Sequence, residues 1–327
     1  MMKKLKSGDP KLIVPTVVIA FLFLFPLMKP SIYFLSFLFT LFTYIALSES
    51  WNLIGGYAGY LSFGHVAFFG VGAYTTALLL IHFGLSPFYT CFFGGILAAI
   101  LAAIFGYPCL RLRGGYFAIA SFCMALAMPV ITRNLDITGA ATGLWMSMLP
   151  FNIFTNRMIF YEVMLTIALI VVLVVRHIEG TKLGLGLKAI GEDEETAEIV
   201  GINTTKLKMT AFVASAFVAG IVGGIYAYYR TYIHPSIVFD VFMTLIIVYM
   251  AFFGGCKSWW GPVIGAAVIT IVNEALTAFL GMPGELARIV FGLTLMLVII
   301  FMPEGIIFFI RKRRAPKKGG FASQPKV

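Results

Sequence analysis

Residues 177–207 read HIEGTKLGLGLKAIGEDEETAEIVGINTTKL and form the longest interruption in an otherwise apolar chain of 327 residues. Of the whole sequence, 60% is hydrophobic and only 12% is charged, and the mean hydropathy is +0.97. A soluble domain carries about 25% charged residues. Because so few charged side chains cannot cover the surface of a soluble protein of this size, the composition predicts an all-α, polytopic integral membrane protein.

On both sides of this interruption the sequence divides into apolar stretches. A helix that crosses a bilayer needs about 20 mainly apolar residues. The pattern predicts about ten transmembrane helices, at 12–28, 31–50, 60–83, 88–110, 115–132, 158–176, 208–229, 237–254, 261–281 and 286–310. Residues 133–157, the second long interruption, are expected to form an external loop. The predicted parts of the chain are an N-terminal segment, a transmembrane domain and a basic tail, at 1–11, 12–310 and 311–327.

The basic residues predict the orientation of these helices. An even number of spans places both termini on one side of the membrane. If that side is the cytoplasm, 19 of the 24 lysines and arginines lie inside and 5 lie outside. Cytoplasmic segments of membrane proteins carry such an excess of positive charge. We therefore expect cytoplasmic termini and a cytoplasmic 177–207 segment, and we interpret the net charge of +10 as a topology signal rather than a nucleic-acid-binding surface.

The chain carries no pattern typical of metal or redox chemistry. Its four cysteines stand singly in or beside apolar stretches, at Cys91, Cys109, Cys123 and Cys256. Isolated cysteines of this kind behave as small hydrophobic packing residues. Because no C-x-x-C pair, Cys/His cluster or nucleophile–base pair is present, we expect neither a bound metal nor enzymatic activity.

Within the long interruption, acidic residues favour the start of a short helix. Four of them are consecutive: Glu192, Asp193, Glu194 and Glu195. Negative charge is favourable at a helix N-terminus, and Gly201 with Asn203 supplies a stop signal. The predicted helix of about two turns carries three apolar contact residues, Ala197, Ile199 and Val200. Such a helix is suited to docking into a groove on another protein; a solvated acidic linker is the alternative.

Two further features point either to packing or to a transport pathway. Glycines concentrate before and within the expected third helix, where small residues allow close helix contact. An interrupted helix near 59–66, with Ser62 and His65 facing the pathway, is the other interpretation. Glu274 lies well inside the expected ninth helix, where a charged group is costly. It forms a buried interhelical hydrogen bond, part of the pathway lining or a contact with a partner subunit.

Several motifs resemble the permease subunits of branched-chain amino acid ABC importers, of the LivM type. Four of them, in the order expected for that family, are GYAGYLSFGHVAFFGVGAY (56–74), LRLRGGYFAIA (110–120), FFGGCKSWWGPVIGAA (252–267) and FMPEGI (301–306). The run 183–212 resembles the family's coupling loop, with Glu195-Thr196-Ala197 and Gly201 in an EAA-x3-G pattern. The resemblance implies these ATPase-coupling residues: Ala189, Glu192, Asp193, Glu194, Glu195, Ala197, Ile199 and Gly201.

The resemblance also implies an assembly in a prokaryotic plasma (inner) membrane. Its other parts are a second, homologous permease, two cytoplasmic ABC ATPase subunits and an external solute-binding protein. This chain has no P-loop, because Lys257-Ser258 follows Cys256 where that motif has Gly. We therefore expect it to bind no cofactor and ATP to be used by the partner ATPases. The permease would alternate between outward- and inward-facing states.

The substrate is less well defined than the machinery. Residues 137–143 resemble the family's threonine–glycine loop, but Ala140, Ala141 and Thr142 depart from the usual pattern, and Leu126 stands where many relatives have Glu. Branched-chain amino acids are favoured; urea, short amides or other small solutes are alternatives. The pathway candidates are Ser62, His65, Thr142 and Glu274. A secondary transporter coupled to protons or sodium is a second class, which needs a cluster of intramembrane carboxylates.

Overall fold

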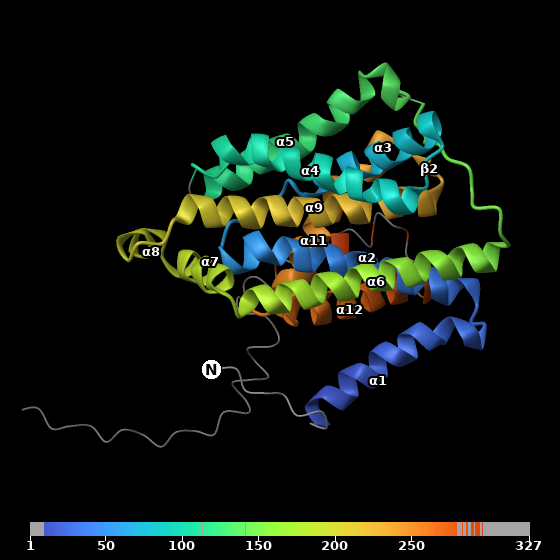
Figure 1. The fold of residues 1–327 in the computed structure, drawn as a ribbon, viewed down its shortest axis with the longest axis horizontal. Coiled ribbons are helices and arrows are strands. Elements are labelled where there is room, and N and C mark those ends of the chain that lie inside the picture. Colours follow the sequence, from blue (N-terminus) through green and yellow to red (C-terminus); the bar gives the residue numbers. More distant parts are fainter. Residues whose placement is uncertain are drawn as a thin grey trace, which may run out of the picture.

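The computed structural model describes residues 10–112, 114–140 and 142–279, with isolated positions between 283 and 296. Apart from those positions, the predicted tenth span at 286–310 lies outside the described residues, as do the 311–327 tail and the FMPEGI motif. Within the described part, long helices lie side by side in one bundle (Figure 1).

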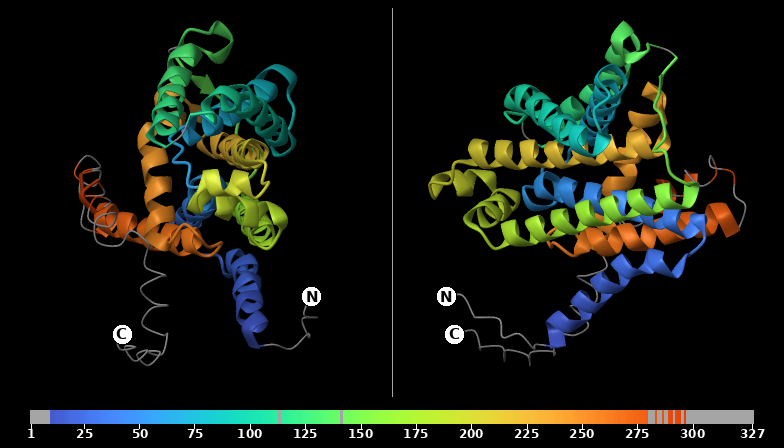
Figure 2. Two further views of the ribbon diagram at one scale, coloured as in Figure 1. Left: turned by 90° about the vertical axis from the view of Figure 1, so that its left-hand side faces the viewer. Right: turned by 45° about the vertical axis from the view of Figure 1, so that its right-hand side comes forward.

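Eight stretches of the described chain are long and apolar enough to cross a membrane. Their main helices are α2 (Ile32–Asn52), α3 (His65–Phe83), α4 (Pro87–Cys109), α5 (Gly115–Arg133), α6 (Ile153–Glu179), α9 (Thr204–Arg230), α11 (Val241–Gly254) and α12 (Gly261–Glu274). A shorter apolar segment comes from α1 (Pro10–Leu24) and the 3-10 turn Phe25–Met28, and its α1 part stands away from the bundle (Figure 2). The prediction of an all-α, multi-pass membrane protein is confirmed.

Some predicted boundaries are wrong. The third helix begins at His65 rather than at residue 60, because α2 ends in a π-helical turn (Leu53–Tyr57) and residues 58–64 are not helical. Gly59 lies within this break with φ of 73°, a conformation that glycine adopts without strain.

Another prediction places one continuous span at 237–254, which the structure divides into α10 (Pro235–Val238) and α11. Asp240 stands between the two helices and caps α11, since its Oδ1 accepts a hydrogen bond from the Phe242 amide at 3.0 Å. Pro235–Gly254 as a whole is long and apolar enough to cross a membrane, so the predicted span is confirmed and only its continuity as one helix is not.

Glycines contribute close backbone contacts where three helices of the bundle meet. Helices α3, α4 and α9 make the most extensive contacts in the described chain. A Cβ atom added to Gly72 would lie 2.0 Å from the carbonyl oxygen of Gly220, and one added to Gly94 would lie 2.8 Å from that of Gly72. Close backbone contact of this kind supplies the van der Waals attraction that holds helices together in lipid. We call these three residues the glycine seam.

A short β-ribbon lies at one end of the bundle. Strand β1 (Leu144–Trp145), in the predicted external loop, pairs antiparallel with β2 (Tyr232–Ile233), which follows α9. The aromatic rings of Trp145 and Tyr232 lie 4.5 Å apart. We call this the ribbon end; the opposite end carries α7 (Lys182–Glu192) and α8 (Glu194–Ile199) and is called the α8 end (Figure 1).

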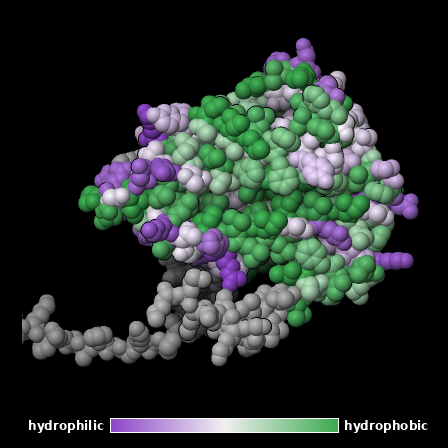
Figure 3. Space-filling view, in the orientation of Figure 1, coloured by the Kyte–Doolittle hydropathy of each residue, from purple (hydrophilic) through white to green (hydrophobic). Residues whose placement is uncertain are grey.

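The surface of the bundle is apolar between its two ends. In Figure 3 hydrophobic residues cover most of the visible face, while hydrophilic residues gather toward the two ends. Large apolar side chains are exposed on the outer helices, among them Phe93, Ile104, Ile119 and Leu173. This distribution fits a protein whose middle part is surrounded by lipid.

Candidate functional site

Residues 177–207 are folded into helices rather than into one loop. Helix α6 continues to Glu179, α7 and α8 follow, and α9 begins at Thr204. The predicted short helix is present, but Glu192 does not open it: this residue ends α7. The reason is Asp193, whose backbone is extended (φ −159°, ψ 112°) and whose carboxylate accepts the Glu195 amide at 3.1 Å.

Helix α7 packs closely against the bundle through glycines. A Cβ on Gly184 would lie 2.1 Å from the Ile178 carbonyl oxygen, and one on Gly191 would lie 2.4 Å from that of Tyr57. Leu187 of the same helix is fully buried. Helix α7 is therefore held directly against the end of α2.

Helix α8 has one buried and one exposed side. Ala197 is buried, whereas Ile199 and Val200 have exposed fractions of 84% and 69%. The helix ends at Ile199. Gly201, two residues later, takes a left-handed conformation (φ 88°), and its amide donates to the Glu198 carbonyl at 2.9 Å. An apolar tip thus projects from the α8 end without cover in the described chain.

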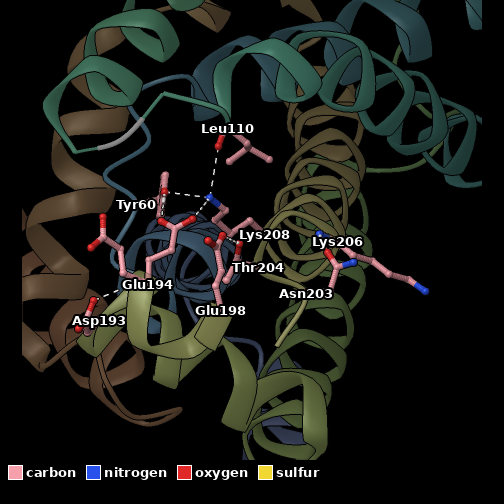
Figure 4. A network of polar contacts seen from close by, with 10 residues as sticks. Tyr60, Leu110, Asp193, Glu194, Glu198, Asn203, Thr204, Lys206 and Lys208 are labelled. Carbon is pink, nitrogen blue, oxygen red and sulfur yellow. Dashed lines mark hydrogen bonds and ion pairs between the residues drawn. The ribbon is translucent and has the colours of Figure 1, made fainter. Parts of the chain in front are cut away.

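A buried ion pair connects the inner side of α8 to the bundle (Figure 4). The Lys208 ammonium, on α9, lies 2.5 Å from Oε1 of Glu194 on α8. It also donates to the Tyr60 hydroxyl at 2.9 Å and to the Leu110 carbonyl at 3.3 Å. The Tyr60 hydroxyl donates in turn to Oε2 of Glu194. Because an ammonium has three N–H donors, this arrangement satisfies all of them.

Further polar contacts tie the neighbouring elements together. Glu179, the last residue of α6, accepts from the Lys188 ammonium at 2.7 Å, the Tyr57 hydroxyl at 3.2 Å and the Trp259 amide at 3.1 Å. Thr204 donates to Glu198 Oε1 at 2.6 Å, which joins α8 to the start of α9. Polar contacts at the α8 end therefore join α6 to α7 and α8 to α9.

Two carboxylates at the surface of this end have perturbed acidity. The ammonium of Lys257 pairs with Glu192 at 2.5 Å and holds the pKa of that carboxyl below its usual value. Both side chains are exposed. The Thr196 hydroxyl, with the backbone amides of Thr196 and Glu195, likewise lowers the pKa of Asp193 by stabilising its charged form.

The structure separates the predicted pathway residues. Ser62 and His65 are buried near the start of α3, where Trp51 Nε1 donates to the Ser62 carbonyl at 2.8 Å and His65 Nε2 lies 3.3 Å from the Ser50 hydroxyl. Thr142 lies at the ribbon end, where its carbonyl accepts from the Tyr232 hydroxyl at 3.2 Å.

Glu274, at the end of α12, accepts a hydrogen bond from Tyr33 of α2. The bond is interhelical, as one interpretation of the sequence expected, but it is exposed rather than buried. Of the four candidates, only Ser62 and His65 share a segment.

Sequence reasoning did not select Lys208, Tyr60 or Glu179 as site residues. One signal for Lys208 was available, because it is a lysine at the first position of the apolar span 208–229. The sequence analysis used it only to predict which side of the membrane the segment faces. Ala189 lies partly buried near the end of α7. Among the described residues, no group of three His, Cys, Asp or Glu side chains comes together in a way that could hold a metal ion.

An apolar helical bundle with polar, structured ends defines a multi-pass membrane protein. Residues 33–299 match the family described as "Branched-chain amino acid transport system / permease component", and the chain belongs to this family of membrane permeases.

Individual relatives agree with this family. The chain is similar to the high-affinity branched-chain amino acid permease protein LivM of Salmonella typhimurium, with 28% identity over 84% of this chain and 70% of that protein. A probable LivM of Methanocaldococcus jannaschii is 27% identical over 81% of this chain and 90% of its own length. LivH of Escherichia coli, also a high-affinity branched-chain permease, is 24% identical over 81% and 91%. No solved structure matches the chain.

Proposed function

We propose that this chain is a permease subunit of an ATP-binding-cassette importer for branched-chain or similar hydrophobic amino acids. The observation that carries the proposal is α8: its inner side is tied into the bundle through Glu194, and its tip exposes Ile199 and Val200. A short helix with an apolar tip and a fixed base suits a groove on a partner protein. Membership of the permease family supports an ATPase as that partner.

The proposed assembly contains four further chains in three roles. A second, homologous permease completes the pathway, and the similarity of this chain to both LivM and LivH proteins supports such a pair. Two ATPase subunits bind at the α8 end and use the ATP, and a solute-binding protein delivers substrate at the ribbon end. The α8 end and both termini then face the cytoplasm of a prokaryote, and the bundle lies in its inner membrane.

The apolar tip provides the test. We expect Ile199→Asp to remove the ATPase from the purified complex and to abolish ATP-dependent uptake of radiolabelled L-leucine in proteoliposomes. Loss of a central apolar contact costs about 2 kcal/mol or more, which corresponds to about 30-fold in affinity. The matched control is Ile137→Asp, because Ile137 is exposed in the 133–157 segment and receives the same charge.

The two variants separate the proposal from a general effect of added charge. Retention of the ATPase and of uptake by Ile199→Asp would contradict the docking role of α8. Leucine uptake that continues without any ATPase and collapses with an ion gradient would contradict the importer mechanism itself. Loss of the ATPase from Ile137→Asp as well would show that the effect is not local to α8.

A further inference from the structure

The non-helical segment 58–64 is held by contacts with several helices rather than by helical hydrogen bonds. The Phe63 amide donates to the Ser121 hydroxyl of α5 at 3.0 Å. Directly after the segment, the Val66 amide donates to the Thr244 hydroxyl of α11 at 3.1 Å. Bonds of this kind can change partner without unwinding a helix. The segment is therefore a joint between α2 and α3.

Two buried polar atoms, one in this joint and one directly after it, have no hydrogen-bond partner in the described part of the chain. They are the Ser62 hydroxyl and Nδ1 of His65, and the two side chains have exposed fractions of 0% and 1%. An unpaired buried polar group is costly. In this arrangement of the joint, the Ser62 hydroxyl and the His65 ring therefore each leave one polar atom without a hydrogen bond among the described residues.

One side chain of the joint reaches α8. Tyr60 donates to Glu194 and accepts from Lys208 at 2.9 Å, and its ring packs edge-on against Phe117 of α5 with centroids 5.2 Å apart. Figure 4 shows the three polar groups meeting at one point between α8, α9 and the joint. The exposed fraction of the Lys208 side chain is 3% and that of Glu194 is 15%.

The Lys208 ammonium also connects Glu194 and Tyr60 to the end of α4, because it donates to the Leu110 carbonyl. Leu110 follows the last residue of α4, and helix C-termini carry partial negative charge that favours a nearby cation. A buried ion pair resists separation, because pulling one partner away leaves the other charge buried and uncompensated. A displacement of α8 must therefore either move Tyr60 with it or break this arrangement.

We propose that Lys208, Glu194 and Tyr60 form a mechanical link through which a displacement of α8 repositions the 58–64 joint. We call these three residues the Lys208 link. The proposal rests on the proposed function, in which ATPase subunits displace α8. Lys208 and Tyr60 act as positioning residues: they touch neither ATP nor substrate, and they determine how much of the movement of α8 reaches the start of α3.

Tyr60→Phe is the most selective test, because it removes one hydroxyl and leaves the Lys208–Glu194 pair and the ring contact in place. The measurement is the number of L-leucine molecules transported per ATP hydrolysed by the assembled complex in proteoliposomes with its binding protein. We expect this ratio to fall about tenfold, the factor that corresponds to losing one hydrogen bond to a charged group. ATPase co-purification should be unchanged.

Lys208 variants provide a graded series. Lys208→Met should lower the ratio at least as far as Tyr60→Phe, and Lys208→Arg should restore part of it, because a guanidinium can still bind the carboxylate. Lys206→Met is the matched control: Lys206 lies two residues earlier on α9, its side chain is exposed, and it points away from the link (Figure 4). Its ratio should equal that of the unsubstituted complex.

The outcomes are distinct. A wild-type ratio in Tyr60→Phe, or a lower yield of complex with an unchanged ratio, would overturn the link, because a purely structural role alters the amount of complex and not its coupling. A ratio in Lys208→Arg no better than in Lys208→Met would also count against it. Failure of the proposed function appears earlier and separately, as leucine uptake by the unsubstituted complex without ATP hydrolysis.

Discussion

The glycine seam and the α8 end hold helices together by different means. In the seam, backbones touch directly: a Cβ on Gly72 would lie 2.0 Å from the Gly220 carbonyl oxygen. At the α8 end, Lys208 and Glu179 join elements by directed polar contacts. At this end glycines also contribute close contacts, through Gly184 and Gly191 of α7. The comparison teaches that the seam depends on backbone packing alone, whereas the α8 end adds directed polar contacts between side chains that are far apart in the sequence.

The largest expected effect comes from adding one methyl group to the seam. Gly72→Ala forces α3 away from α9, and overpacking of this kind costs about 1–3 kcal/mol, occasionally more. We expect a large loss of folded protein, measured as the monodisperse fraction in detergent and as thermal stability. Gly115→Ala is the control, since a Cβ there meets no atom within 4 Å. Equal yields of folded protein from the two variants would contradict the claim that close packing in the glycine seam is needed for folding.

A second glycine substitution sharpens the comparison at the α8 end. Gly191→Ala places a methyl group 2.4 Å from the Tyr57 carbonyl oxygen, while Gly180→Ala makes only an ordinary contact at 3.7 Å with that of His177. We expect Gly191→Ala to fold but to displace α7, so that limited proteolysis cuts 177–207 faster than in Gly180→Ala. A loss of folded protein as large as in Gly72→Ala would show that folding needs the packing of α7 as much as that of the glycine seam.

The exposed ion pair should matter much less than the buried one. Glu192 and Lys257 have exposed fractions of 72% and 67%. Because water and salt screen such a pair, Lys257→Ala should leave the number of L-leucine molecules transported per ATP within about twofold of the unsubstituted complex. A ratio reduced as strongly as in Lys208→Met would mean that burial does not explain the importance of Lys208.

The smallest expected effect is a pH dependence of the α8 cap. The lowered pKa of Asp193 means that its charged form stabilises the folded helix; this contribution is fully present above the usual value of 3.8 and is lost as the pH falls through the lower folded value. Amide exchange in α8, corrected for intrinsic rates, should therefore accelerate on acidification. Asp193→Asn should lose this pH dependence. Exchange that slows on acidification would contradict the assignment of the cap.

Much of the fold could be predicted because lipid demands long apolar helices. The stretches at 88–110 and 115–132 correspond closely to α4 and α5. Helix α7 was missed because Gly184, Gly186 and Gly191 look like loop residues. In the structure these glycines permit close approach to Ile178, Leu207 and Tyr57, respectively, and that packing outweighs their low helix propensity.

The site was predicted only as far as local sequence could show it. Consecutive acidic residues and Gly201 indicated α8, because helix caps are local signals. Glu194 and Lys208 are 14 residues apart, but Tyr60 comes from a segment 134 residues away from Glu194. No spacing in a single sequence reveals such a meeting point. The partner of Glu274 was hidden for the same reason, since Tyr33 lies 241 residues away.

Helix α9 reaches both ends of the described structure. Its first residues are capped by Asn203 and include Lys208, and after its last residue Thr231 accepts from the Met146 amide at 2.7 Å beside the β-ribbon. Its 27 residues give it a length of about 40 Å. Because α9 is one continuous helix, a tilt of it moves Lys208 at one end and Thr231 at the other together. A displacement at one end of the protein therefore reaches the other end without an intervening element.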